Sequence, residues 1–306
     1  MKIPFEQTIA GAYRFAFTNI LSVFGIGWFP FLLFGAGATA AVISVLPLFS
    51  GLIREGTYEI DTARLGAVIA PIIGTYVLIL CGLIFTQAMV NVGMMRKALG
   101  QHPAPVFIFF SLGRQVWQLI GSYLLLLLLA WGTIALAAGA IIAISLVLAK
   151  FAPSAVQVLV TVLLVIAAYV WAVYAIVRVS FFIPAVVVAE NHISLRRAWH
   201  LGKGNFWRII GVMIIVAVLP SMALSTILQF IIQSIAGPPV VLTQNPTPAE
   251  AMAVFERMMS AFVKAGPYIA GLEFVYVIVA SGLLAGAVAA AYNGVTSGEA
   301  SAKASA

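Results

Sequence analysis

The chain has 306 residues, of which 63% are hydrophobic and only 8% are charged, and its formal net charge is +7 at pH 7. A soluble domain is about half apolar and about a quarter charged, and a soluble fold of this length has too little interior to bury the remaining apolar surface. A soluble globular protein is therefore excluded, and lipid is the expected solvent for most of the chain. The single cysteine, Cys81, excludes an intramolecular disulfide and a metal site built on several cysteines.

Six apolar stretches are long enough to cross about 30 Å of hydrocarbon as helices. In chain order they cover residues 20–46, 67–89, 119–148, 155–177, 209–235 and 268–292. Only residues 149–154 separate the third stretch from the fourth, which predicts a tight antiparallel hairpin. Glu6 and Arg14 interrupt the residues before the first stretch, so we expect no cleavable signal. The predicted fold class is all-α: a polytopic membrane helix bundle with six transmembrane helices.

The basic residues are unevenly divided between the two sides of these spans. Eleven of the sixteen lie on one side: Lys2, Arg14, Arg96, Lys97, Arg114, Arg178, Arg196, Arg197, Lys203, Arg208 and Lys303. By the positive-inside rule this side is cytoplasmic, which predicts cytoplasmic N- and C-termini and a multi-pass protein of the bacterial inner (plasma) membrane. Its positive charge indicates contact with anionic lipid headgroups, and we expect no nucleic acid as a partner.

A motif that runs from an amide to a glycine occurs three times, at the start of each odd span. The copies are residues 19–25 (NILSVFG), 115–121 (QVWQLIG) and 205–211 (NFWRIIG), 96 and 90 residues apart. They predict one membrane domain, residues 1–306, made of three parallel two-span repeats of about 1–100, 101–190 and 191–306 around a pseudo-threefold axis. Aromatic and basic residues before each motif predict cytoplasmic amphipathic helices, which anchor the spans at the interface or bind lipid or protein.

Residues 178–192 (RVSFFIPAVVVAENH) and 194–208 (SLRRAWHLGKGNFWR) carry a family resemblance. This pattern, an Arg at the end of a span, then a Pro, a Glu and a Leu-Arg-Arg-x-Trp segment, resembles the membrane domain of some bacterial glycerophosphoryl diester phosphodiesterases. That domain also occurs alone in six-span proteins. The resemblance implies the architecture only, because the catalytic barrel of those fusions is a separate soluble domain and this chain has no stretch left to form one.

The strongest candidate site lies in this stretch. A charge at membrane depth is costly, about 3 kcal/mol on insertion scales, so Arg178 at the end of the fourth span should pair or reach the interface. A helix break at Pro184 either folds Glu190 back toward Arg178 or leaves it to neighbouring basic residues. The site is a structural ion pair or a lipid-headgroup site, since a guanidinium binds phosphate bidentately. Its residues are Arg178, Glu190, Arg196, Arg197 and Lys203.

A second candidate is an intramembrane polar site near the outer end of the last two spans. Glu273 is the only acid in a predicted span, and it is either an interface anchor or an ion or proton site. Gln229 and Gln233, one turn apart on the fifth span, are predicted to line the same pocket. The outer loop, residues 237–266, begins as an extended Gly-Pro-Pro linker. From Thr247 it is predicted to form an amphipathic helix on the outer leaflet or across the bundle mouth.

The sequence has no phosphate-binding glycine loop, no metal-ligand motif and no nucleophile beside a base, so we expect no enzyme, no cofactor and no metal. Two functions are left. The first is a non-enzymatic membrane protein that organises lipids, or a protein partner at its cytoplasmic face, through the basic rim. The alternative is a transporter or lipid-translocating protein with a path along the pseudo-threefold axis.

Overall fold

The computed structural model describes residues 2–54, 62–102, 106–236 and 248–304, and within these ranges it contains helices and no strands. The helices are α1 (Phe5–Thr18), α2 (Ile20–Arg54), α3 (Thr62–Ala98), α4 (Arg114–Phe151), α5 (Ser154–Ser180), α6 (Ile183–Glu190), α7 (Leu195–Leu201), α8 (Phe206–Met213), α9 (Leu219–Ala236) and α10 (Pro248–Ala304). A π-helical turn, Ile214–Val218, joins α8 to α9 within one long span.

Six helical segments of the described chain are long and apolar enough to cross a membrane. They are Ile20–Leu48, Ile69–Ala98, Arg114–Phe151, Ser154–Glu190, Phe206–Ile235 and Val263–Gly298. Each contains or overlaps one predicted span, so the prediction of an all-helical, multi-pass membrane protein is confirmed. The hairpin between the third and fourth spans is also confirmed, because only Ala152 and Pro153 separate α4 from α5.

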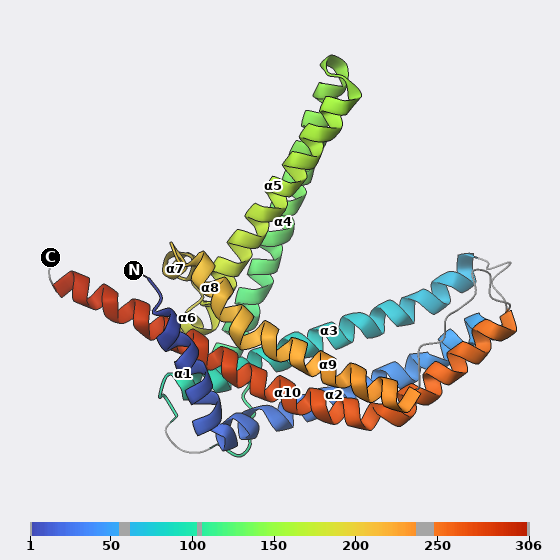
Figure 1. Cartoon of the computed structure of the whole chain (residues 1–306), viewed down its shortest axis with the longest axis horizontal. Helices are drawn as coiled ribbons and strands as arrows, with labels where there is room; N and C mark the ends of the chain where they lie inside the picture. Colours follow the sequence, from blue (N-terminus) through green and yellow to red (C-terminus); the bar gives the residue numbers. More distant parts are fainter. Residues whose placement is uncertain (1, 55–61, 103–105, 237–247, 305–306) are drawn as a thin grey trace.

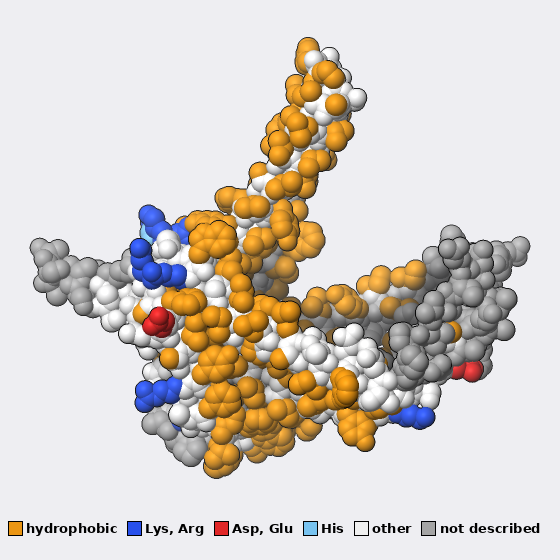
Figure 2. Space-filling view, viewed as in Figure 1, with side chains coloured by type: hydrophobic (Ala, Val, Ile, Leu, Met, Phe, Trp, Pro, Cys, Tyr) orange, Lys and Arg blue, Asp and Glu red, His pale blue; other side chains and the backbone are white. Residues whose placement is uncertain are grey.

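Consecutive spans pair into hairpins, α2 with α3, α4 with α5, and α9 with α10. The hairpin of α4 and α5 stands away from the other four spans and meets them only at its base (Figure 1). On the face shown in Figure 2, hydrophobic side chains cover this hairpin over most of its length. Lipid tails are as apolar as these side chains, so the hairpin needs no protein cover. The six helices therefore do not pack against one another along their full lengths.

The length of the spans is consistent with this divergence. The 38 residues of α4 form a helix about 57 Å long, nearly twice the hydrocarbon thickness of about 30 Å. Helices that are too long for the bilayer tilt, and hairpins that tilt in different directions separate at one end while they meet at the other. We call the end where they meet, formed by α1, α6, α7 and α8 with the adjoining ends of the spans, the basal end.

The buried core lies at the basal end, around α6. Five of the eight residues of α6 are at most 2% exposed, among them Val186, Val187 and Val188. The helix contacts α3, α4, α5, α7 and α10, so it is a short apolar peg that the other elements surround. Hydrophobic side chains from the N-terminal segment, from the C-terminal part of α3 and from residues 278–295 of α10 complete the core.

The break in the fourth span falls where Pro184 predicts it. α5 ends at Ser180, and Pro184 occupies the first turn of α6, where its missing N–H leaves no helical hydrogen bond unmade. At the other end of α6, Asn191 adopts the left-handed conformation, with φ of 53°, and turns the chain toward α7. Arg178, α6 and α7 therefore follow one another within 24 residues.

The outer segment differs from the prediction of a separate interfacial helix. Residues from Pro248 onward are helical, but they continue through Pro267 into the sixth span as one helix of 57 residues. Thr247 and the linker 237–247 lie outside the described residues, as do the side chains of Met252, Phe255 and Phe262.

The fourth residue of each amide-to-glycine motif bonds to the backbone of a segment that is distant in the sequence. The bonds run from Val106 N to Ser22 Oγ (3.4 Å), from Gln118 Nε2 to the Asn191 carbonyl (3.2 Å), and from Arg208 Nη1 to the Ile3 carbonyl.

The last residue of each motif, a glycine, approaches the same three segments. A Cβ on Gly25 would overlap the carbonyl oxygen of Val106, and one on Gly211 would lie 2.9 Å from the Phe5 ring. On Gly121, a Cβ would lie 3.4 Å from Ile193 Cδ1, which is ordinary contact. A side chain would therefore clash at Gly25 and at Gly211, but not at Gly121.

Candidate functional site

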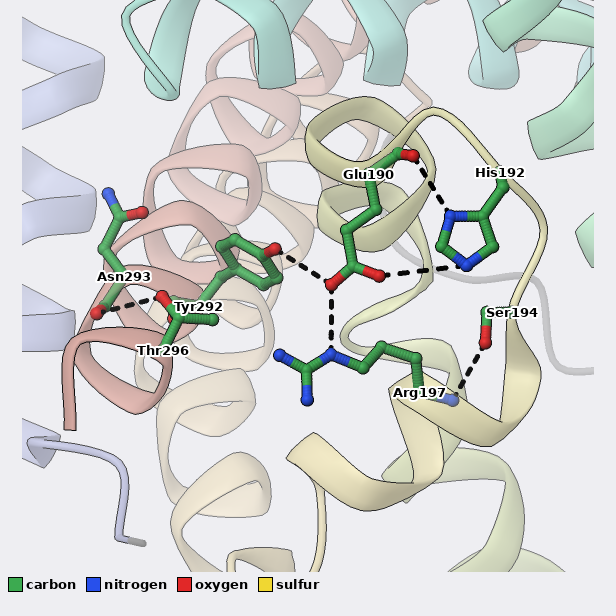
Figure 3. A network of polar contacts seen from close by, with 7 residues as sticks. All are labelled: Glu190, His192, Ser194, Arg197, Tyr292, Asn293 and Thr296. Atoms are coloured by element: carbon green, nitrogen blue, oxygen red, sulfur yellow. Dashed lines mark hydrogen bonds and ion pairs between the residues drawn. The ribbon is translucent and has the colours of Figure 1, made fainter. Parts of the chain in front are cut away.

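Glu190, the last residue of α6, ties three helices together at the basal end (Figure 3). Its Oε1 accepts hydrogen bonds from Arg197 Nε of α7 at 3.0 Å and from the Tyr292 hydroxyl of α10 at 3.1 Å. His192 Nε2 lies 3.9 Å from the second carboxylate oxygen. The side chains of Glu190 and Arg197 are 22% and 31% exposed, so water weakens this ion pair only in part.

Of the two predicted arrangements, the structure contains the one in which Glu190 binds a neighbouring basic residue. That residue is Arg197, and Glu190 makes no ion pair with Arg178 or Arg196. The N-cap of α7 explains the choice, because Ser194 Oγ accepts from the Arg197 N–H at 3.1 Å and fixes the start of the helix. The sequence analysis missed Tyr292, whose position 102 residues away carries no signal in the sequence.

Arg178 is 5% exposed and has no carboxylate within ion-pair distance in the part of the chain that is described. Its Nε donates to the Trp199 carbonyl at 3.1 Å, and its Nη1 donates to the Tyr174 hydroxyl at 2.9 Å. The guanidinium carbon lies 3.8 Å from the centroid of the Trp199 ring. A desolvated cation–π contact of this kind is worth about 2 kcal/mol, so aromatic faces and neutral oxygens take the place of an anion.

The contact between Arg178 and α7 requires a glycine. A Cβ on Gly202 would lie 2.5 Å from Arg178 Cγ and from the Arg178 carbonyl oxygen. Gly202 has φ of −74°, so its absence of a side chain, and not an unusual backbone conformation, is what the site needs. Arg178 is thus a positioning residue that holds α7 against the end of the fourth span.

The other basic residues of the candidate site face outward. α7 buries Ala198 and Leu201 and exposes Arg196 on the opposite side, and Lys203 follows it, also exposed. Neither side chain forms an ion pair within the described ranges, because the nearby carboxylate of Glu190 is bound to Arg197. Basic side chains gather at the end of the molecule where α1, α7 and the termini lie (Figures 1 and 2).

Three glutamines of the second unit hold the C-terminal end of α6. Gln101 Nε2 and Gln115 Nε2 donate to the Val188 carbonyl at 3.4 and 3.3 Å, and Gln118 Nε2 donates to the Asn191 carbonyl at 3.2 Å. Helix carbonyls at a C-terminus have no partner within the helix, so these amides satisfy them. Gln115 is the motif amide, but the sequence did not indicate that it caps another helix.

The described structure shows no polar contact among the residues of the predicted intramembrane polar site, which stays a prediction. Glu273, Gln229 and Gln233 are all exposed, and no hydrogen bond joins them to one another. Glu273 also forms no ion pair with Lys264 in the described structure. Polar contacts between spans lie elsewhere, and one of them joins α3 to α4, where Asn91 Nδ2 donates to the Tyr123 hydroxyl at 3.0 Å.

Among the described residues, no group of three or more His, Cys, Asp or Glu side chains could hold a metal ion. Comparison with known proteins finds no matching family model, no matching curated protein and no matching solved structure. The resemblance to the phosphodiesterase membrane domain therefore stays a prediction that depends on residues 178–208. Function has to be argued from the geometry of the basal end itself.

Proposed function

We propose that this chain is a non-enzymatic membrane protein that organises anionic lipids, or a protein partner that such lipids recruit, through the basic surface of its basal end. One observation carries the proposal. Arg196 and Lys203 are exposed with no carboxylate partner in the described structure, while the adjacent Glu190 is bound to Arg197. Two cations without counter-charges at the end of a membrane span are suited to lipid phosphates.

The rest of the basal end strengthens this attraction. Lys2, Arg14 and Arg114 are exposed as well, and each basic residue near an anionic membrane surface contributes about 1 kcal/mol. Trp207 of α8, at the same end of the molecule, is 78% exposed and suits the headgroup layer, where tryptophan is enriched. By the positive-inside rule, we place this end in the cytoplasm and the chain in the inner membrane of a bacterium.

We further propose that three two-span units close into a ring at the basal end, as the sequence repeat predicts. Each motif binds the segment that begins the next unit: the first motif binds residues 106–107, the second 191–193, and the third returns to 3–5. Corresponding positions in the three copies make corresponding contacts, which supports a pseudo-threefold relation. The ring explains why the basic segments of all three units face the same membrane surface.

A transporter with a path along the ring axis is the alternative. A cavity of about 190 Å³ lies where the units meet, lined by Asn91, Tyr123, Ser180 and Met213 among others. On its basal side the apolar residues of α6 are buried, so a path would need this packed layer to open. The closed packing gives the transporter less support than the exposed basic surface gives to lipid organisation.

The test is the lipid composition that remains with the protein after extraction in a polymer that keeps native lipid. We expect the wild type to be enriched in anionic phospholipid relative to the whole membrane, and Arg196→Gln with Lys203→Gln to lose this enrichment. The matched control removes the same charge from two exposed residues far from the basal end, Lys150→Gln with Lys264→Gln, and should stay enriched. Equal enrichment in both variants, or a stoichiometric protein partner without lipid enrichment, would contradict the proposal.

A further inference from the structure

An apolar groove runs along the hairpin of α4 and α5. It consists of two adjoining hollows of about 390 and 710 Å³. Thr133, Trp171, Ala172 and Ile176 line both hollows, so the two are continuous. The smaller hollow ends at α7, where Arg196 and Trp199 form its basal wall.

The lining of the groove admits an apolar occupant. The hydroxyl of Thr133 donates to the Ala130 carbonyl at 2.8 Å, so it is already satisfied within the helix. The remaining side chains along the shared part are aliphatic or aromatic. On α4 the groove extends from Leu126 to Ile142, a helical distance of about 24 Å. One leaflet of hydrocarbon is about 15 Å thick, so the groove is long enough for a whole acyl chain.

The basal end of the groove carries the complementary charge. Arg196 is exposed, has no ion pair in the described ranges, and lies at the depth where a lipid phosphate would be. Trp199 is held in place there, because Arg178 stacks on its ring and donates to its carbonyl. A planar guanidinium beside a fixed aromatic wall suits a phosphate group, which it can bind through two parallel hydrogen bonds.

We propose that this groove is the binding site for a single phospholipid, with an acyl chain along α4 and α5 and its phosphate on Arg196. The inference rests on the proposed lipid function of the basal end, and it adds the ligand class and the position of its two parts. An ordinary boundary lipid exchanges freely and prefers no helix face, whereas a lipid in this groove is held by its chain and its phosphate together.

The experiment uses tryptophan fluorescence in detergent, with Trp171 and Trp199 kept as reporters and the other four tryptophans changed to phenylalanine. The probe is phosphatidylglycerol with brominated acyl chains, because bromine quenches indole on contact. Brominated diacylglycerol has the same chains and no phosphate, and it serves as the comparison lipid. We expect quenching that saturates at one lipid per protein, with about tenfold tighter binding of phosphatidylglycerol than of diacylglycerol.

Substitutions separate the two parts of the site. Ala172→Phe fills the groove and should abolish saturable quenching by both lipids, and Ala168→Phe, a second lining position, should do the same. Ala167→Phe, beside the groove on the same helix, should behave as the parent. Arg196→Gln should keep the quenching and lose the preference for phosphatidylglycerol.

Three results would overturn the inference. Quenching that rises linearly with lipid and is equal in the filled and control variants would identify boundary lipid only. Loss of binding in both filled variants and in the control would show no role for the groove. Absence of saturable quenching together with a dimer in light scattering would identify a second copy of the chain as the occupant. None of these affects the lipid enrichment test, so a failed groove and a failed basal surface are distinguishable.

Discussion

Arg178→Met should destabilise the protein by breaking the contact between the fourth span and α7. Methionine keeps the apolar stem and removes the donors to Trp199 and Tyr174. Two hydrogen bonds from a charged group contribute about 1.5 kcal/mol each and the cation–π contact about 2, while removing the buried charge returns part of its desolvation. The net loss is about 3 kcal/mol. For a chain of this size that corresponds to a fall of about 8 °C in Tm.

The assay is thermal unfolding in one detergent, followed by light scattering and by the fluorescence of a reporter dye on exposed Cys81. Gly202→Ala should lower Tm as well, because its Cβ would lie 2.5 Å from Arg178 Cγ and carbonyl oxygen. Arg114→Met, an exposed arginine at the same end, is the control and should leave Tm within about 2 °C. If Arg178→Met also left Tm unchanged but removed bound lipid, Arg178 would be a headgroup ligand and the positioning role would be refuted.

Three further predictions concern other contacts. Tyr292→Phe should lower the free energy of unfolding by about 1 kcal/mol, and Glu190→Ala by about 2 kcal/mol because it also loses the bond to Arg197. A double-mutant cycle should give a coupling between the two substitutions, because each removes their shared hydrogen bond, and additive effects would contradict that bond. Gly211→Ala should destabilise the protein by about 1–3 kcal/mol, because its Cβ would press on the Phe5 ring. Gly37→Ala is the control, because no atom lies near that position, and it should leave the stability unchanged. Equal thermal stabilities of the two variants would refute the ring contact. Glu273→Gln should leave Tm unchanged, since the exposed carboxylate has no partner in the described structure, and a shift above 2 °C would reveal one.

The spans could be predicted from the sequence because each is a long apolar run, and the break at Pro184 because proline lacks the N–H that a continuing helix requires. The course of the hairpin of α4 and α5 away from the other spans could not be predicted. Hydropathy gives the same signal for a helix that packs on protein and for one that faces lipid.

At the candidate site, the pairing of Glu190 could be predicted only in part. Glu190 was assigned either to Arg178 or to the arginines after it, and the left-handed turn at Asn191 with the cap at Ser194 selects Arg197. The contact of Arg178 with Trp199 depends on the distance between α5 and α7, and no local pattern in the sequence reports that distance. Glu273 and the two glutamines are exposed and share no hydrogen bond in the described structure, because position along a span does not fix which way a helix faces.

The closing bonds of the basal end carry a consequence for the order of folding. The Ile3 N–H donates to Asn205 Oδ1 at 2.8 Å, across a sequence separation of 202 residues, and the Ile3 carbonyl accepts from Arg208. The N-terminal segment leaves the ribosome first, yet the residues that bind it are made only when two thirds of the chain has been inserted. α1 must therefore wait at the membrane surface through the synthesis of four spans. The spans insert one after another, whereas the native basal end forms in a late step that needs both the fifth and the sixth spans.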